Sequence, residues 1–129
     1  MFLSSKTLVL LPARALVLGA CQSSRRSADL VYVERPVERL YTLGVAEMDE
    51  RDFDNAIAYF NEVERQHPYS AWARRAMLMK AFGYYQQNDY DEAVDALDQF
   101  ISLHPGNKDA PYAYYLKAMS YYERIRDVG

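Results

Sequence analysis

Few side chains in this chain have the type and spacing that catalysis or metal binding requires. The 129 residues include one cysteine and two histidines. Neither His67 nor His104 has an acidic or histidine partner at ligand spacing. No serine or cysteine is placed beside a base, and the carboxylates at 49–54 and 89–98 are spaced as solvated helix faces and turns. We therefore expect no metal, no cofactor and no catalytic site, and we look for a binding function.

Cys21 is the residue with the clearest chemical role. It follows Leu18, Gly19 and Ala20, at the end of a segment in which a lysine precedes apolar residues. That layout is typical of a secretory signal, and residues 18–21 resemble a bacterial lipobox, where a peptidase cuts before the cysteine and its sulfur carries lipid. The alternative is a free or buried thiol near a plain signal peptide. Residues 1–20 are thus predicted to be a lipoprotein signal peptide.

A tether is expected between the lipid and the folded part. Residues 21–36 are polar and turn-prone and end in Pro36, a composition that favours an extended linker. Several acyl chains on Cys21 would hold the chain stably on a membrane. Gln22 follows the cysteine, and by resemblance to bacterial lipoproteins a residue other than aspartate there implies sorting to the outer membrane.

The rest of the chain is organised by an internal repeat with a period of 37 residues. Residues 89–94 (DYDEAV) align with residues 52–57 (DFDNAI), and His104-Pro105 aligns with His67-Pro68. In the other direction, residues 80–85 (KAFGYY) align with residues 117–122 (KAMSYY). A repeat of this length is typical of stacked helical hairpins.

Apolar periodicity and breaker residues predict five helices. The first begins at Val37 and is broken at Arg51-Asp52, and the others cover about 54–66, 71–87, 91–103 and 111–126. Asn88 is expected in the turn of the second hairpin, because asparagine tolerates the left-handed conformation. The predicted packing positions are Leu40, Leu43, Gly44, Glu47, Ala56, Phe60, Val63, Met77, Ala81, Tyr84, Ala93, Leu97 and Phe100.

The pattern resembles the tetratricopeptide repeat. Small residues at fixed places let two helices approach closely, and Gly44, Ala81 and Ala118 match the small position of the first helices. The resemblance implies an all-α fold, an α-solenoid of about two and a half tetratricopeptide-like hairpins at 37–70, 71–107 and, in part, 108–129. Lys80 and Lys117 stand where leucine is usual, and we expect them to be solvated or to snorkel.

The fifth helix has no partner in this pattern, although it is apolar nearly all round. Repeat arrays normally end in a cap with a polar outer face. We therefore expect residues 1–129 to be the N-terminal part of a longer protein, or the product of a truncated gene.

A groove is expected where the first helices of the hairpins line a concave surface. Its predicted contacts are Tyr41, Val45, Met48, Leu78, Phe82, Tyr85, Tyr115, Met119 and Tyr122, with Arg74 and Arg75 as the nearest cations. An aromatic groove with an arginine edge suits an extended peptide that carries aromatic side chains and a terminal carboxylate. The alternative is that these side chains are core, and that Tyr115 and Tyr122 pack on a further helix.

The lipobox, tether and long-period repeats together resemble the BamD family, also called YfiO or ComL. The resemblance extends from Leu18 to the end and includes the stretches at 52–57, 83–94 and 113–129. It implies a lipid-anchored scaffold on the periplasmic face of the outer membrane that takes part in β-barrel assembly and insertion. It also implies three partners: the barrel-forming assembly subunit, accessory lipoproteins, and unfolded outer-membrane protein precursors, whose C-terminal segments would occupy the groove.

Two other functions fit the same repeats. One is a periplasmic adaptor for cell-wall enzymes, and the other is the targeting arm of an absent catalytic domain. Nucleic acid is not an expected partner, because a formal net charge of −3 does not provide a basic footprint.

Overall fold

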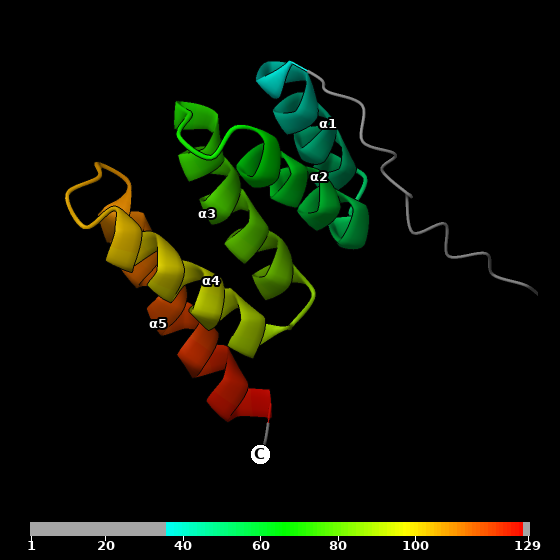
Figure 1. Ribbon diagram of the computed structural model, residues 1–129. Coiled ribbons are helices and arrows are strands. Elements are labelled where there is room, and N and C mark those ends of the chain that lie inside the picture. The colour runs from blue at the N-terminus through cyan, green and yellow to red at the C-terminus, as the bar shows by residue number, and fades with distance from the viewer. Residues whose placement is uncertain (1–35, 128–129) are drawn as a thin grey trace, which may run out of the picture.

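Five α-helices and no strands make up residues 36–127, the part of the chain that the computed structural model describes (Figure 1). They are α1 (Val37–Asp49), α2 (Phe53–Gln66), α3 (Ala71–Gln86), α4 (Tyr90–Leu103) and α5 (Ala110–Asp127). The predicted all-α class is confirmed. The predicted signal peptide (1–20), Cys21 and all of the tether except Pro36 lie outside the described residues.

Local chemistry explains where the helices begin and turn. The Asp52 carboxylate accepts a hydrogen bond of 3.2 Å from the Asn55 amide, and the Ser70 hydroxyl accepts one of 3.0 Å from the Ala73 amide. Each cap satisfies an amide that has no partner within its helix. Arg51 and Asn88 take the left-handed conformation, with φ of 61° and 67°. These two residues occupy equivalent turn positions, one repeat period apart.

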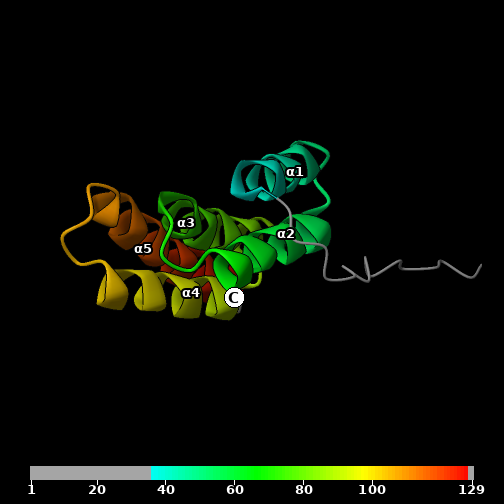
Figure 2. The same ribbon diagram turned by 45° about the horizontal axis from the view of Figure 1, so that its top comes forward.

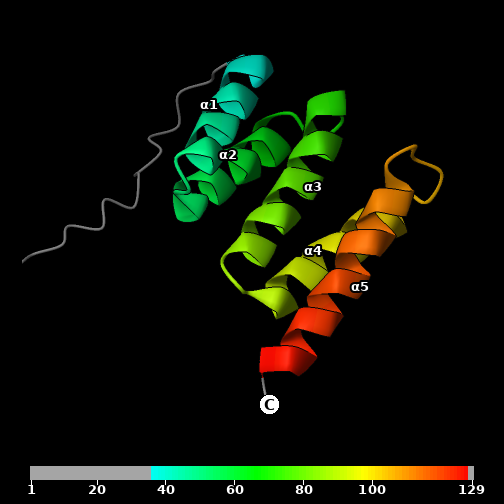
Figure 3. The ribbon, with the colours of Figure 1, turned by 180° about the vertical axis from the view of Figure 1, so that it is seen from behind.

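The helices form two layers. Consecutive helices pack against one another, and α3 also contacts α1 and α5. Figure 2 shows α1 and α3 on one side of α2 and α4, and Figure 3 shows α1, α3 and α5 in succession from behind. We call α1, α3 and α5 the first-helix layer. This arrangement is that of a solenoid in which each hairpin stacks on the previous one.

Helix α3 contributes to two apolar cores. Its Ala73 and Ala76 join the core formed with α1 and α2, whereas its Met77, Leu78 and Ala81 join the core formed with α4 and α5. The remaining members are Leu40, Met48, Ala56, Phe60 and Val63 in the first core and Ala96, Leu97, Phe100, Ala113 and Leu116 in the second. Because α3 is apolar on both sides, it couples the first hairpin to the second.

Close helix approach depends on the predicted small positions. A Cβ atom built on Gly44 would lie 2.7 Å from Cε1 of Phe60, which is fully buried. In the next repeat the equivalent residues are Ala81 and Leu97, and both are fully buried. Alanine is larger than glycine, and leucine is smaller than phenylalanine, so the two changes in size offset each other. The residue in the third unit, Ala118, is exposed.

The two repeat lysines, which were expected to be solvated or to snorkel, each form an ion pair. Lys80 Nζ lies 2.7 Å from Glu64 Oε1 on α2, and the two side chains are only 12% and 21% exposed. Lys117 pairs with Asp98 on α4, and this hydrogen bond raises the pKa of Lys117. Each lysine therefore joins a first helix to the second helix of the preceding hairpin.

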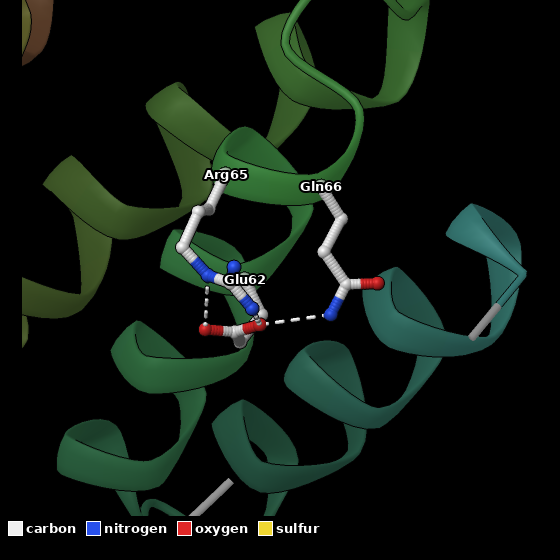
Figure 4. A network of polar contacts seen from close by, with 3 residues as sticks. All are labelled: Glu62, Arg65 and Gln66. Atoms are coloured by element: carbon white, nitrogen blue, oxygen red, sulfur yellow. Dashed lines mark hydrogen bonds and ion pairs between the residues drawn. The ribbon is translucent and has the colours of Figure 1, made fainter. Parts of the chain in front are cut away.

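A polar network also lies near the end of α2 (Figure 4). Arg65 donates two hydrogen bonds to Glu62, at 2.9 Å from Nε and 2.6 Å from Nη2, and Gln66 donates another at 2.8 Å. The pKa of Glu62 lies below its usual value of 4.5, chiefly because of the hydrogen bonding from Arg65. The hydrogen bond from Gln66 lowers the pKa further, whereas burial opposes the shift.

Candidate functional site

An open pocket lies in the first-helix layer between α1 and α3. It has a volume of about 410 Å³ and is lined by Val45, Met48, Asp49, Arg51, Phe53, Met79, Phe82 and Gln86. We call this site the α1–α3 pocket. Its walls are mostly apolar or aromatic, and its charged and polar groups are Asp49, Arg51 and Gln86. A cavity of this size and composition suits one or two apolar side chains of a ligand.

Successive repeats differ at positions that line this pocket. Val45, Met48 and Phe53 stand where Phe82, Tyr85 and Tyr90 stand one period later. In that later repeat, the Phe82 and Tyr85 rings stack with centroids 6.5 Å apart, and Tyr85 meets the edge of Tyr90 at 5.7 Å. The first repeat carries Val45 and Met48, which have no ring, at the positions of two of these three aromatic residues.

The structure brings three of the predicted groove residues, Val45, Met48 and Phe82, together in the pocket. Val45 and Phe82 are half-buried, whereas Met48 is 9% exposed and forms part of the pocket's base and the first core. Leu78 is 8% exposed and packs in the second core. Leu78 therefore has little surface to offer a ligand.

Tyr41 lies in an aromatic cluster at the other end of α1. Its ring is 5.6 Å from Phe60 and 5.0 Å from Trp72, and burial raises the pKa of its hydroxyl although Arg75 opposes the shift. The Arg75 guanidinium lies over the Trp72 ring at 5.2 Å. Arg75 precedes Phe82 by seven helical residues, about 10 Å along α3. Arg74, its neighbour, is half-buried.

On α5 the predicted residues Tyr115 and Tyr122 are both 59% exposed, and Met119 is half-buried. With Tyr112 they form one apolar stripe at helical spacing. A second stripe comprises Tyr114, Ala118 and Tyr121, which stand one period after Met77, Ala81 and Tyr84. In α3 these earlier residues face α4, whereas in α5 the second stripe is exposed.

Sequence reasoning missed five pocket residues: Asp49, Arg51, Phe53, Met79 and Gln86. Met79 and Gln86 lie on the side of α3 that faces α1, whereas the prediction used only the spacing of the matched alanines. Arg51 and Phe53 lie in the turn and at the start of α2. The turn itself was predicted at Arg51-Asp52, but no signal in the sequence placed its side chains against α3.

Two further searches cover only the part of the chain that the structure describes. Residues 36–127 contain no group of three or more histidine, cysteine or acidic side chains arranged to hold a metal ion. No helix among these residues is both long and apolar enough to span a bilayer. Cys21, the predicted lipidation site, lies outside this part of the chain.

A family model described as YfiO, outer membrane lipoprotein, matches residues 33–129 and so includes every described residue. This chain belongs to the YfiO family. Membership places it among the outer membrane lipoproteins. The predicted BamD/YfiO resemblance is therefore confirmed, as is the tetratricopeptide-like helical fold that it implied.

Two relatives of this YfiO chain are outer membrane protein assembly factors. BamD of Caulobacter vibrioides is 48% identical over 71 residues, which are 55% of this chain and 23% of that protein. BamD of Rickettsia prowazekii is 42% identical over 81 residues, which are 63% of this chain and 31% of that protein. The chain thus matches less than a third of the length of either relative.

Proposed function

We propose that this chain is a non-enzymatic, lipid-anchored scaffold that takes part in assembling β-barrel proteins in the outer membrane. Membership of the YfiO family and the likeness to two BamD proteins support this function. Its site of action would be the periplasmic face of the outer membrane, with Cys21 as the lipid attachment point. The barrel-forming assembly subunit and accessory lipoproteins would be its partners in that machinery.

Within this function, the α1–α3 pocket would bind segments of unfolded barrel precursors. The observation that carries this proposal is the pocket itself, an open site in the first-helix layer whose walls combine apolar and aromatic side chains with Asp49, Arg51 and Gln86. Strands of membrane barrels alternate apolar and polar residues. An extended segment of this kind could place an apolar side chain in the pocket while its polar side chains stay in water.

Tyr85, Tyr115, Met119 and Tyr122 would extend the contact along the first-helix layer. Tyr85 is half-buried beside Phe82, and the α5 residues present an exposed apolar stripe in the same layer. Tyr41, Arg74 and Arg75 would meet the segment at the opposite end of α1 and α3. Met48 and Leu78 are nearly buried, so they would contribute mainly by supporting the side chains that contact the ligand.

Photocrosslinking in living cells tests the site. A photoreactive amino acid is placed at Val45, Phe82 or Tyr122, and at the exposed Asp95 and Gln99 on α4 as controls. We expect unfolded outer-membrane proteins to be captured from the first three positions and not from the controls. Capture of a cell-wall enzyme alone would instead favour the adaptor function, and equal capture from the controls would contradict the proposed site.

A pocket-filling variant provides a second test. Val45→Phe with Met48→Tyr introduces the residues that the second repeat carries at the equivalent positions, so the fold already accommodates them one period later. Filling the pocket should abolish crosslinking from Phe82 while circular dichroism and the melting temperature remain close to those of the parent. Undiminished crosslinking in a folded variant would show that the pocket is not the binding site.

A further inference from the structure

Helix α5 has an apolar face that no other described element covers. Within residues 36–127, α5 packs against α4 and α3, and Figure 3 shows it at the end of the first-helix layer that is far from α1. Its exposed large apolar side chains are Tyr112, Tyr114, Tyr115, Tyr121, Tyr122 and Ile125. Elsewhere in this part of the chain, the exposed large apolar side chains are Tyr69 and Leu103. An apolar surface of this extent marks a docking site.

The apolar residues of this face are arranged symmetrically about Ala118. Tyrosines stand three and four residues before it and three and four residues after it, and Pro111 and Ile125 stand seven residues before and after it. We call this set the α5 outer face: Pro111, Tyr114, Tyr115, Ala118, Tyr121, Tyr122 and Ile125. At 3.6 residues per turn these side chains lie within about 60° on either side of Ala118, and the buried Leu116 and Ser120 lie on the opposite side of the helix.

The preceding repeat lacks this symmetry. The residues that stand 37 positions before the five central residues of the face are Met77, Leu78, Ala81, Tyr84 and Tyr85. They belong to the second core or pack against it, and α4 covers them. The types before and after Ala81 differ, as suits a face that meets a different helix. In α5 the types before and after Ala118 are the same, as suits a face that meets a copy of itself.

We propose that the α5 outer face binds the same face of a second copy of this chain, with the two α5 helices antiparallel and crossing at Ala118. In a two-fold interface, residue i of one copy contacts residue j of the other, and j contacts i. Tyr114 then meets the partner's Tyr122, and Tyr115 meets the partner's Tyr121. The two Ala118 residues meet at the axis, where their small side chains let the helices approach closely. This inference goes beyond the proposed function and does not depend on it.

The exposed area is sufficient for such an interface. The four tyrosines of the face are between 38% and 59% exposed, and Ile125 is 70% exposed. Since a buried aromatic side chain covers about 150–250 Å², the tyrosines offer about 400 Å² per copy. With Pro111, Ala118 and Ile125 the dimer would bury about 1,000 Å², the size that a specific interface requires. Antiparallel pairing also places the negative end of each helix dipole beside the positive end of the other.

The dimer leaves the α1–α3 pocket open, because no residue that lines the pocket lies on α5. Each dimer would therefore carry two open pockets. Tyr115 and Tyr122 would be covered, so a precursor segment that reaches α5 would compete with the second copy for these two residues.

Analytical ultracentrifugation of the purified full chain over a range of concentrations tests the pairing. We expect a monomer–dimer equilibrium. Ala118→Glu places two carboxylates at the axis and should raise the dissociation constant of the dimer at least tenfold. Ala118 is exposed in the monomer, so the circular dichroism spectrum should not change. Gln99→Glu, at an exposed position on α4, is the matched control and should leave the dissociation constant unchanged.

Two results of this measurement would overturn the proposal. One is a parent chain that remains monomeric at every concentration. The other is a dimer that Ala118→Glu and Gln99→Glu weaken equally, because the interface would then not lie on α5.

Disulfide formation tests the antiparallel register. In a Cys21→Ser background, Ala118→Cys should cross-link two copies on oxidation, because a disulfide requires Cα atoms within about 7 Å. Tyr115→Cys should cross-link far less, since its two copies would lie six residues, or about 9 Å, apart along the helices. Adding Tyr121→Cys to Tyr115→Cys should restore cross-linking. Equal cross-linking of Ala118→Cys and Tyr115→Cys would mean parallel helices and would overturn this register.

Photocrosslinking in living cells identifies the occupant of the face. A photoreactive amino acid at Ala118 should give a product that contains two copies of this chain and no other protein, as mass spectrometry of the product would show. A product with a precursor or with another protein in place of the second copy would assign the α5 outer face to that partner, and the proposed pairing would be wrong.

Discussion

Gln87 Nε2 donates a 2.7 Å hydrogen bond to Asp54 Oδ1, and this contact joins the end of one first helix to the start of the preceding second helix. The same contact recurs one period later, where Arg124 pairs with Asp91. Both partners shift by 37 residues, so the relation belongs to the repeat and not to one hairpin. It fixes the register between consecutive hairpins at the edge of each interface.

This equivalence predicts that Gln87→Arg is tolerated and slightly stabilising. The new guanidinium would face Asp54 as Arg124 faces Asp91, and exposed ion pairs contribute about 0.2–1 kcal/mol to the free energy of unfolding. The gain should appear in thermal unfolding at low salt and disappear in 1 M NaCl, where the screening length is about 3 Å. Gln99→Arg, on the exposed face of α4, is the matched control. A gain that persists in high salt would point to packing instead of charge.

Gly44→Ala should destabilise the protein by up to about 2 kcal/mol. The added methyl would lie 2.7 Å from Phe60, and overpacking of this kind costs about 1–3 kcal/mol, which exceeds the gain of about 1 kcal/mol from replacing a helical glycine. Urea unfolding followed by circular dichroism measures the difference. Gly106→Ala, where a Cβ atom meets nothing within 4 Å, should change stability by less than about 0.5 kcal/mol.

A compensating change sharpens this prediction. Gly44→Ala combined with Phe60→Leu copies the pair Ala81 and Leu97 of the second repeat. The double variant should recover part of the stability lost by Gly44→Ala, because the smaller side chain makes room for the methyl group. If the two changes were simply additive, the steric account of Gly44 would be wrong.

The helices and the core were predictable because their signals are local. Apolar residues at helical spacing, Pro68 and Pro105 after the second helices, and Asn88 in the turn all act within a few residues of the chain. The buried positions Ala56, Phe60, Ala93 and Leu97 followed from the repeat, since residues in equivalent places face equivalent neighbours.

The pocket and the ion pairs were not predictable in this way. The pocket is lined by residues of α1, α3 and the turn before α2, and these residues come together only once α1 and α3 are adjacent. The pairing of Lys80 with Glu64 requires the relative register of α2 and α3. An alignment of repeats shows which residues are equivalent, but not how far each side chain reaches across an interface.

Lys80→Met should destabilise the protein more than Lys117→Met does. The Lys80–Glu64 side chains are 12% and 21% exposed, whereas those of Lys117 and Asp98 are 27% and 50% exposed. Removing Lys80 leaves the partly buried Glu64 carboxylate without its cation, at a cost of about 1–3 kcal/mol. The more exposed Lys117–Asp98 pair should contribute at most about 1 kcal/mol to the free energy of unfolding. Equal losses in chemical denaturation would contradict the role assigned to burial.

Glu62→Gln should reduce the loss of stability in acid. The hydrogen bonds from Arg65 and Gln66 lower the pKa of Glu62 in the folded state, so the unfolded state binds more protons between the two pKa values. The stabilisation is fully present above pH 4.5, the ordinary pKa of the group, and is lost as the pH falls through the lower pKa of the folded state.

Urea unfolding at pH 7 and at a series of lower pH values measures this pH-dependent contribution to the free energy of unfolding. The variant should be less stable than the parent at pH 7, and the difference should shrink on acidification. A constant difference between Glu62→Gln and the parent at every pH would remove the carboxylate as its cause.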